Sequence, residues 1–194
     1  MKNVRILIAV ALMLPIALGA QQPTSTPRSS RANPVTESFK GFGYLGNWLM
    51  AAFDSIPADR YDYRPTPAQQ SIGYVAQHLE DANYALCARF GGVARPMTAK
   101  DSLADTVKAK WPKDTLVARL RTSLLFCRDA IERVNDANLG DEYPVGPAGS
   151  GRTSVRSRDL ILFVTDLADH YSQISNYMRL LGMIPPSALP RHHR

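Results

Sequence analysis

The chain has 194 residues, of which 23 are Lys or Arg and 17 are Asp or Glu, and its formal net charge at pH 7 is +6. The basic residues are scattered among acidic ones and form no stripe interleaved with aromatic residues, which argues against nucleic acid as a partner. The length suits one domain with an adequate hydrophobic core.

The N-terminus has the pattern of a secretory signal. Lys2 and Arg5 precede an apolar run over residues 6–18 that only Pro15 interrupts, and small residues up to Ala20 lead into a polar stretch. A run of this length is shorter than the roughly 20 residues that cross a bilayer, so a signal peptide is favoured over a membrane anchor. We expect residues 1–20 to be removed and the mature protein, 194 minus 20 or 174 residues, to be exported to the periplasm or the exterior without a membrane span.

The domain is expected to begin after a linker. Residues 21–33 lack apolar periodicity and are predicted to be flexible, residues 34–186 to form the folded domain and residues 187–194 a C-terminal tail. Asn33 and Pro34 have the pattern of an N-cap followed by Pro at the first helical position. Apolar residues recur from there at three- and four-residue spacing and predict a helix that ends near Pro57.

A second helix is predicted after a capping-box pattern. Thr66, Pro67 and Gln69 indicate its start, and Gly91 with Gly92 indicates its end. The following segment is irregular, apart from a short helical turn expected within residues 103–109.

Two further helices complete the expected fold. The third is predicted over residues 114–135, and residues 138–152 are predicted to be a Gly- and Pro-rich loop without a sheet. The fourth is predicted to begin at a Thr153 or Ser154 cap and to end at Gly182. Four long amphipathic helices predict an all-α fold, a four-helix bundle with long connections, and leave the order of the helices open.

Cys87 and Cys127 are the two cysteines of the chain. In an exported protein they can form one intramolecular disulfide. The alternative is a pair of buried free thiols, because free Cys is often buried, and the sequence leaves both readings open.

Polar residues at the edges of two helices suggest a metal site. At about 100° per residue, Asp166, His170, Gln173 and Tyr177 fall on one edge of the fourth helix, and His78 has the corresponding place on the second. Asp166 and His170 are four residues apart and can reach one ion, which His78 from a facing helix would complete. Two imidazoles and a carboxylate suit a divalent metal: zinc, nickel, iron or manganese. The alternative is a surface Asp–His pair and a hydrogen-bonded His without metal.

The motifs that carry these residues resemble those of the DinB-like (DinB/YfiT) family. Residues 64–73 and 75–84 are similar to the family's second-helix motif, and residues 166–174 and 177–186 to its fourth-helix motif, over a match that spans residues 34–186. The resemblance implies a four-helix bundle in which three His commonly hold a metal. By position His78 and His170 match the first and last ligands, whereas Asp166 stands where the family commonly has the middle His. A carboxylate shifts the preference toward harder metals, and the departure leaves open that this chain has lost its metal.

The resemblance also implies two functions of different kinds. Some relatives are thiol-dependent transferases and others are amide hydrolases, so one expectation is a metal-dependent enzyme with a small-molecule substrate. The other is a non-catalytic metal- or ligand-binding module associated with stress, because a fold does not select a function. The sequence assigns no catalytic residue and leaves a homodimer open.

Overall fold

The computed structural model describes residues 32–190, so the predicted signal peptide, residues 21–31 of the linker and the end of the tail lie outside the described residues. The main elements are α1 (Pro34–Lys40), α2 (Tyr44–Ser55), α3 (Ile72–Gly91), α4 (Asp105–Lys108), α5 (Lys113–Ile131), β1 (Glu142–Pro144), β2 (Thr153–Val155) and α6 (Arg156–Leu180). Short 3-10 turns cover Gly41–Gly43, Ala58–Arg60, Ala99–Ser102, Asp136–Asn138 and Pro186–Ala188. The all-α prediction is confirmed, and within this range no helix is long and apolar enough to cross a bilayer.

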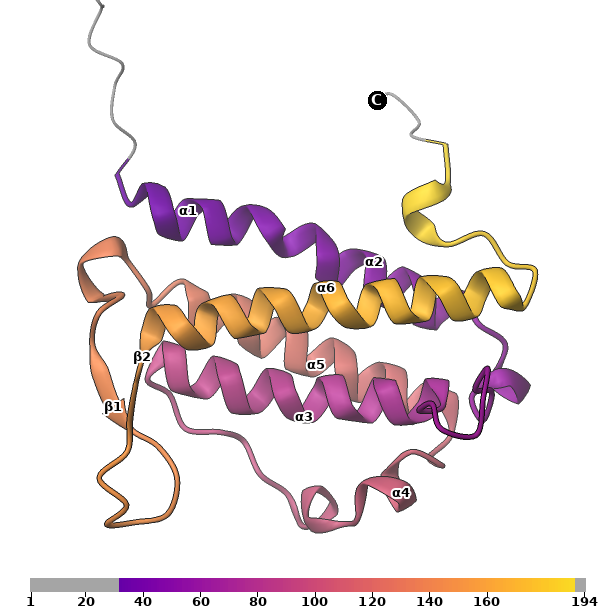
Figure 1. Cartoon of the computed structure of the whole chain (residues 1–194), viewed down its shortest axis with the longest axis horizontal. Helices are drawn as coiled ribbons and strands as arrows, with labels where there is room; N and C mark the ends of the chain where they lie inside the picture. The colour runs from indigo at the N-terminus through magenta and orange to yellow at the C-terminus, as the bar shows by residue number, and fades with distance from the viewer. Residues whose placement is uncertain (1–31, 191–194) are drawn as a thin grey trace, which may run out of the picture. The chain divides into compact units, whose positions relative to one another are not determined.

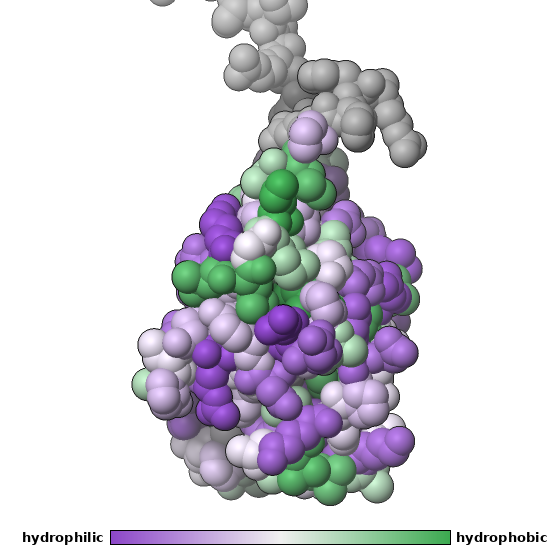
Figure 2. All heavy atoms as spheres, turned by 90° about the vertical axis from the view of Figure 1, so that its right-hand side faces the viewer, coloured by the Kyte–Doolittle hydropathy of each residue, from purple (hydrophilic) through white to green (hydrophobic). Residues whose placement is uncertain are grey.

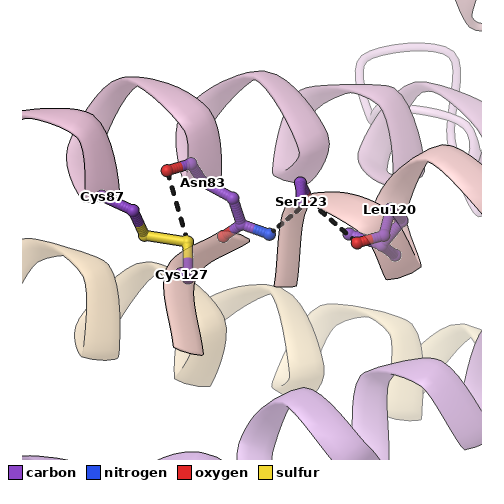
Figure 3. Close-up of a disulfide and its surroundings, with 5 residues drawn as sticks. All are labelled: Asn83, Cys87, Leu120, Ser123 and Cys127. Atoms are coloured by element: carbon purple, nitrogen blue, oxygen red, sulfur yellow. Dashed lines mark hydrogen bonds between the residues drawn. A yellow bond between two sulfur atoms is a disulfide. The ribbon is translucent and has the colours of Figure 1, made fainter. Parts of the chain in front are cut away.

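Helices α3 and α5 run parallel to each other. Asn83 on α3 donates to Ser123 on α5, and Cys87 is joined to Cys127, and both pairs are 40 residues apart in the sequence (Figure 3). Because the sequence separation between paired residues stays constant along the two helices, the helices point in the same direction. The connection through α4 therefore returns along the bundle before α5 begins, as Figure 1 shows.

Helix α6 completes the bundle by packing against both α2 and α3. The main core consists of apolar residues from α2, α3, α5 and α6, with Phe53, Leu79, Leu120 and Ile174 fully buried. A second apolar cluster surrounds the two cysteines and includes Phe90 and Leu160. The apolar periodicity of the sequence thus marks the faces that meet in the core.

Helix α3 ends in a close approach to α5. A Cβ atom at Gly91 would lie 2.8 Å from the Cβ of Ala130, so a larger residue would push the two helices apart. Gly92 then adopts a left-handed conformation with φ of 62°, which is the helix stop predicted from the sequence.

Arg119 on α5 holds the returning connection in place. Its guanidinium lies 2.7 Å from Glu80 of α3, also pairs with Asp101 of the connection, and covers the ring of Trp111 at 4.9 Å. Glu80 is only 5% exposed, and loss of one partner of such a buried pair costs about 3–5 kcal/mol.

Asp159 in the first turn of α6 fixes the opposite end of the bundle. The side chain is fully buried, accepts a hydrogen bond from Arg89 Nε of α3 at 2.6 Å and accepts another from the hydroxyl of Tyr143 in β1. A carboxylate at this position also interacts favourably with the N-terminus of its helix. One buried charge thus joins α3, α6 and the hairpin.

Apolar side chains are also exposed where the chain leaves the bundle. Leu180, Ile184 and Leu189 are each more than half exposed. Figure 2 views the end of the bundle at which α6 ends, and hydrophobic residues gather mainly in its upper half.

The first helix differs from the prediction in two respects. It is interrupted by the 3-10 turn at Gly41–Gly43, and Asn33 provides no side-chain cap because it adopts a left-handed conformation. The cap comes from Asp136, whose carboxylate accepts from the amides of Val35 and Thr36 at 3.0 and 2.8 Å. The N-terminus of α1 is therefore capped by a residue about 100 positions away and not by the neighbouring Asn33.

The predicted start of the second helix was wrong. Residues 66–69 form an isolated turn, and α3 begins at Ile72 with Ser71 as N-cap. The amide of Ile72 donates to the carbonyl of Tyr63 at 3.1 Å, which holds the preceding segment folded back on the helix start. The capping-box residues therefore lie in the loop before α3, and their pattern did not determine where the helix begins.

The third and fourth helices also have different boundaries. Helix α5 ends at Ile131, and Thr153 and Ser154 lie in β2 instead of capping α6. Strand β2 pairs antiparallel with β1, with Tyr143 opposite Ser154, so the expectation of no sheet was wrong. Three-residue strands on either side of a long Gly- and Pro-rich loop are too short to produce a visible alternation. The helical turn expected within residues 103–109 is present as α4.

The disulfide reading of the cysteines is confirmed. The Cα atoms of Cys87 and Cys127 are 5.1 Å apart, and both side chains are buried. The bond closes a loop that contains the whole connection between α3 and α5.

We expect the double substitution Cys87→Ala and Cys127→Ala to lower the free energy of unfolding by about 3–4 kcal/mol, because a cross-link over a separation of 40 residues restricts the unfolded chain. Urea denaturation of the oxidised wild type and the variant measures the difference. Wild-type protein unfolded in the presence of a reductant is the control and should lose a similar amount. Equal stability of the oxidised and reduced wild type would contradict a structural role for the bond.

Candidate metal centre

The three predicted ligands come together between α3 and α6. His78 lies on α3, and Asp166 and His170 lie one turn apart on α6. Asp166 Oδ1 is 3.9 Å from His78 Nε2 and 3.5 Å from His170 Nε2, and one ligand atom from each residue lies within 4.8 Å of the other two. Ligand atoms that share a tetrahedral ion at about 2.1 Å are roughly 3.4 Å apart, so only small side-chain movements separate this arrangement from a coordination set.

The cluster is open on the side of α3. The side chains of His78, Asp166 and His170 are 38%, 25% and 9% exposed, so His78 lies at the rim and His170 at the base. An ion held by these three residues could be reached from solvent over His78, as a catalytic site with open coordination positions requires.

An unpartnered oxygen supports the fit of a cation. Among the described residues, Asp166 Oδ2 is buried and has no hydrogen-bond partner. A buried carboxylate oxygen without a donor loses its hydration without compensation. A cation bound by both carboxylate oxygens would supply the missing interaction, and the two imidazoles and the carboxylate are ligand types that first-row divalent ions accept.

Two imidazoles keep Asp166 ionised. Burial by itself would raise the pKa of Asp166, but the interactions with His170 and His78 outweigh it and lower the pKa to about 2. The carboxylate therefore carries a negative charge at any pH at which the protein would meet a metal.

His170 is held at both ring nitrogens. Burial would lower its pKa, but the carboxylate of Asp166 and the hydrogen bond with Gln173 outweigh this effect and raise the pKa above 6.5. Nδ1 lies 2.9 Å from Gln173 Oε1, while Nε2 faces Asp166. The ring is thus fixed with one nitrogen toward a neutral amide and the other toward the cluster.

Two aromatic contacts orient His78. Its ring stacks on Tyr74, one turn earlier on α3, with an interplanar angle of 11° and 6.5 Å between centroids. The ring of His170 meets it edge-on, at 67° and 4.9 Å. Asp81 shares the His78 edge of α3, but it pairs with Arg95 and Lys108 and takes no part in the cluster.

Sequence reasoning placed Gln173 and Tyr177 on the same edge as the ligands but did not find their hydrogen bonds. Gln173 Nε2 donates to the Tyr177 hydroxyl at 3.0 Å, and that hydroxyl donates to the carbonyl of Gln70 at 3.1 Å. The spacing of three and four residues on one helix could have suggested the first contacts. No sequence signal marks the Gln70 carbonyl, because every residue has one.

A groove away from the cluster lies elsewhere on the bundle. It has a volume of about 680 Å³ and is formed by α1, α2, α5 and α6, with Phe39, Met50, Leu124 and Phe163 in its apolar lining. Its lining residues, all within the described part of the chain, do not include the three candidate ligands. The metal cluster is therefore separate from this groove.

Comparison with known proteins agrees with this fold. A family model described as the DinB superfamily matches residues 47–174, which is 128 of the 194 residues, and the chain belongs to this superfamily. It is a DinB-superfamily protein with a candidate metal site of two His and one Asp. No curated protein matches the chain.

Two solved structures share the fold. A DinB-like protein from Bacillus cereus ATCC 10987 has 18% sequence identity and a TM-score of 0.59, with 77% of this chain and 95% of that one covered. A conserved protein from Enterococcus faecalis has 16% identity and a TM-score of 0.56, with 76% and 96% covered. At these identities the likeness concerns the fold alone.

The coupling of Asp166 and His170 should be visible in metal-free protein. We expect Asp166→Asn to lower the pKa of His170, because the neutral amide no longer stabilises the imidazolium. NMR titration of the imidazole measures the change. Asp169→Asn is the matched control and should have a smaller effect, because Asp169 acts on His170 only through a weaker charge interaction.

The same coupling gives stability a pH dependence. Because the pKa of His170 is raised in the folded protein, the stabilisation that its protonation provides is fully present below pH 6.5. This stabilisation is lost as the pH rises through the pKa of His170 in the folded state. The lowered pKa of Asp166 means that its contribution is present above 3.8 and lost as the pH falls toward about 2. Asp166→Asn should therefore destabilise metal-free protein more at about pH 5 than at about pH 9. Equal destabilisation at both would contradict the coupling.

Proposed function

We propose that this protein binds one divalent cation through His78, Asp166 and His170 and uses it in a metal-dependent hydrolase or thiol-transferase reaction on a small-molecule substrate. The observation that supports this best is the convergence of three ligand atoms from two helices to within 4.8 Å of one another. An Asp and a His one turn apart on a helix are common on protein surfaces. A second His from another helix and a buried, unpartnered carboxylate oxygen are not expected from a surface pair.

The residues present define the chemistry that the site can support. A divalent ion with open coordination positions acts as a Lewis acid and activates water or a thiol as a nucleophile at neutral pH. Asp166 supplies a permanent negative charge, His170 supplies a nitrogen from the base of the site, and His78 supplies one from the exposed rim. A substrate would approach over His78, because this is the most exposed of the three ligands.

The ligand types restrict the choice of ion. Two neutral imidazoles suit zinc, nickel, iron or manganese, and the carboxylate at position 166 favours the harder members of this group compared with a three-His site. The carboxylate also neutralises one of the two positive charges of the ion.

Metal content is the direct test. Protein purified without a His tag should retain close to one divalent ion per chain, measured by elemental analysis after dialysis. Asp166→Ala should weaken binding by more than the roughly 10–100-fold that loss of an outer partner costs, whereas Asp166→His should retain metal because it supplies a ligand. Asp169→Ala, which removes an exposed acid from the same helix, is the matched control and should bind like the wild type. Wild-type affinity in Asp166→Ala would exclude the site.

Turnover separates an enzyme from a binding module. Metal-loaded protein should convert a member of a panel of thiol-transfer and amide substrates, and His170→Ala should abolish this conversion without loss of helix content by circular dichroism. Metal-loaded protein that converts none of the panel with zinc, nickel, iron or manganese would favour the alternative, a non-catalytic metal- or ligand-binding module.

Export is proposed as the setting of this activity. Two features support it: the signal-like pattern of residues 1–20 and the disulfide between Cys87 and Cys127, a type of bond that persists in oxidising compartments.

Mass spectrometry of the protein recovered outside the cytoplasm should show a mature N-terminus at Gln21. An intact Met1 on protein from the membrane fraction would instead indicate an uncleaved anchor. Cytoplasmic protein with an intact N-terminus would reject export altogether.

A further inference from the structure

A chain of hydrogen bonds leads from the candidate metal centre to the backbone in front of α3. His170 Nδ1 contacts Gln173 Oε1 at 2.9 Å, Gln173 Nε2 donates to the Tyr177 hydroxyl at 3.0 Å, and that hydroxyl donates to the Gln70 carbonyl at 3.1 Å. Tyr177 and His170 are buried, Gln173 is half-buried, and Gln70 lies at the surface, so the chain runs from the base of the site outward.

The carbonyl at the end sets the direction of every bond in this chain. A backbone carbonyl can only accept, so the single hydroxyl proton of Tyr177 is used on Gln70. The tyrosine oxygen then accepts from the amide nitrogen of Gln173, which turns the amide oxygen toward His170. An amide oxygen needs a donor, and His170 Nδ1 must therefore carry a proton.

The reverse direction leaves a group without its partner. If the Gln173 amide were turned around, its oxygen would face Tyr177 and take the hydroxyl proton. The Gln70 carbonyl would then lose its donor within the protein, and the Gln173 nitrogen would face a ring nitrogen that must be unprotonated.

The neutral imidazole of His170 carries one ring proton, and two acceptors compete for it. Gln173 Oε1 lies 2.9 Å from Nδ1, and the ionised Asp166 lies 3.5 Å from Nε2. A proton on Nε2 would satisfy the carboxylate but would block the nitrogen that faces the cluster. A proton on Nδ1 leaves the lone pair of Nε2 free for a cation.

We infer that Gln173 is a positioning residue for the metal centre: with Tyr177 and the Gln70 carbonyl behind it, it holds neutral His170 in the Nδ1–H tautomer, so that Nε2 is free to bind the ion. The role of this tautomer in ion binding rests on the proposed function. The tautomer itself does not, because the hydrogen bonds exist without the ion. These hydrogen bonds also connect the segment before α3 to α6. Helix α3 carries His78, and α6 carries the other two ligands.

The tautomer can be read in metal-free protein. Nitrogen-15 NMR above the pKa of His170 should show a protonated Nδ1 and an unprotonated Nε2 in the wild type. Gln173→Leu removes the acceptor, and the proton should move to Nε2, where Asp166 attracts it. Gln173→Glu keeps an acceptor oxygen for Nδ1 and should keep the wild-type tautomer. Asn176→Leu, an exposed position on α6 outside the hydrogen-bond chain, is the control for adding a leucine to this helix.

Zinc affinity provides the second measurement, by competition with a chromophoric chelator. Gln173→Leu should bind zinc about 10–100-fold more weakly than the wild type, and Asn176→Leu should bind like the wild type. Gln173→Glu should recover most of the affinity, which a purely structural role of the glutamine would not predict. Circular dichroism confirms that each variant is folded.

The outcomes separate this inference from the proposed function. If the wild type binds zinc and Gln173→Leu changes neither the tautomer nor the affinity, the positioning role is excluded and the metal site stands. If the wild type binds no divalent metal but Gln173→Leu still moves the proton, the proposed function fails and the control of the His170 tautomer stands. If the wild type itself shows a protonated Nε2, the inference is overturned directly.

Discussion

The alignment of α3 with α6 is the constraint on which the candidate site depends. His78 is on one helix, and Asp166 and His170 are on the other, so a slip of one helical turn, about 5.4 Å, would remove His78 from the reach of the carboxylate. Helix α3 is held on both sides. The disulfide and the close approach at Gly91 fix it to α5, and the ion pair of Arg89 with the buried Asp159 fixes its C-terminal half to α6.

Charged groups hold the parts of the chain that the apolar core does not reach. Arg119 joins Glu80 and Asp101 across the long connection between α3 and α5, and Asp159 joins two helices and the hairpin. Buried pairs of this kind contribute little net stability compared with apolar packing, but breaking one leaves an unpaired charge. Arg119 thereby attaches the long connection to α3 and α5, and Asp159 attaches the hairpin to α6.

At the candidate site, electrostatic attraction outweighs the cost of burial. Burial disfavours the ionised form of Asp166 and the protonated form of His170, yet each stabilises the charged form of the other. Below the raised pKa of His170, the imidazolium is the partner of the carboxylate in metal-free protein. A bound cation would replace that proton, because a histidine ligand must be unprotonated, and the hydrogen bond of Gln173 to the opposite ring nitrogen leaves the nitrogen that faces the cluster available.

The sequence by itself determined the four helical segments, the glycine stop of α3 and the edge on which the candidate ligands lie, because helical periodicity is a local property of the chain. Tertiary structure decided the rest. Helix α3 begins at Ile72, later than predicted, because carbonyls of the preceding loop take its first amides. Asp136 caps α1 in place of Asn33 from about 100 residues away. Helix packing likewise decided that α3 and α5 are parallel and that the two cysteines are paired. Packing brings together residues that are far apart in the sequence, and such contacts leave no local pattern from which they could be predicted.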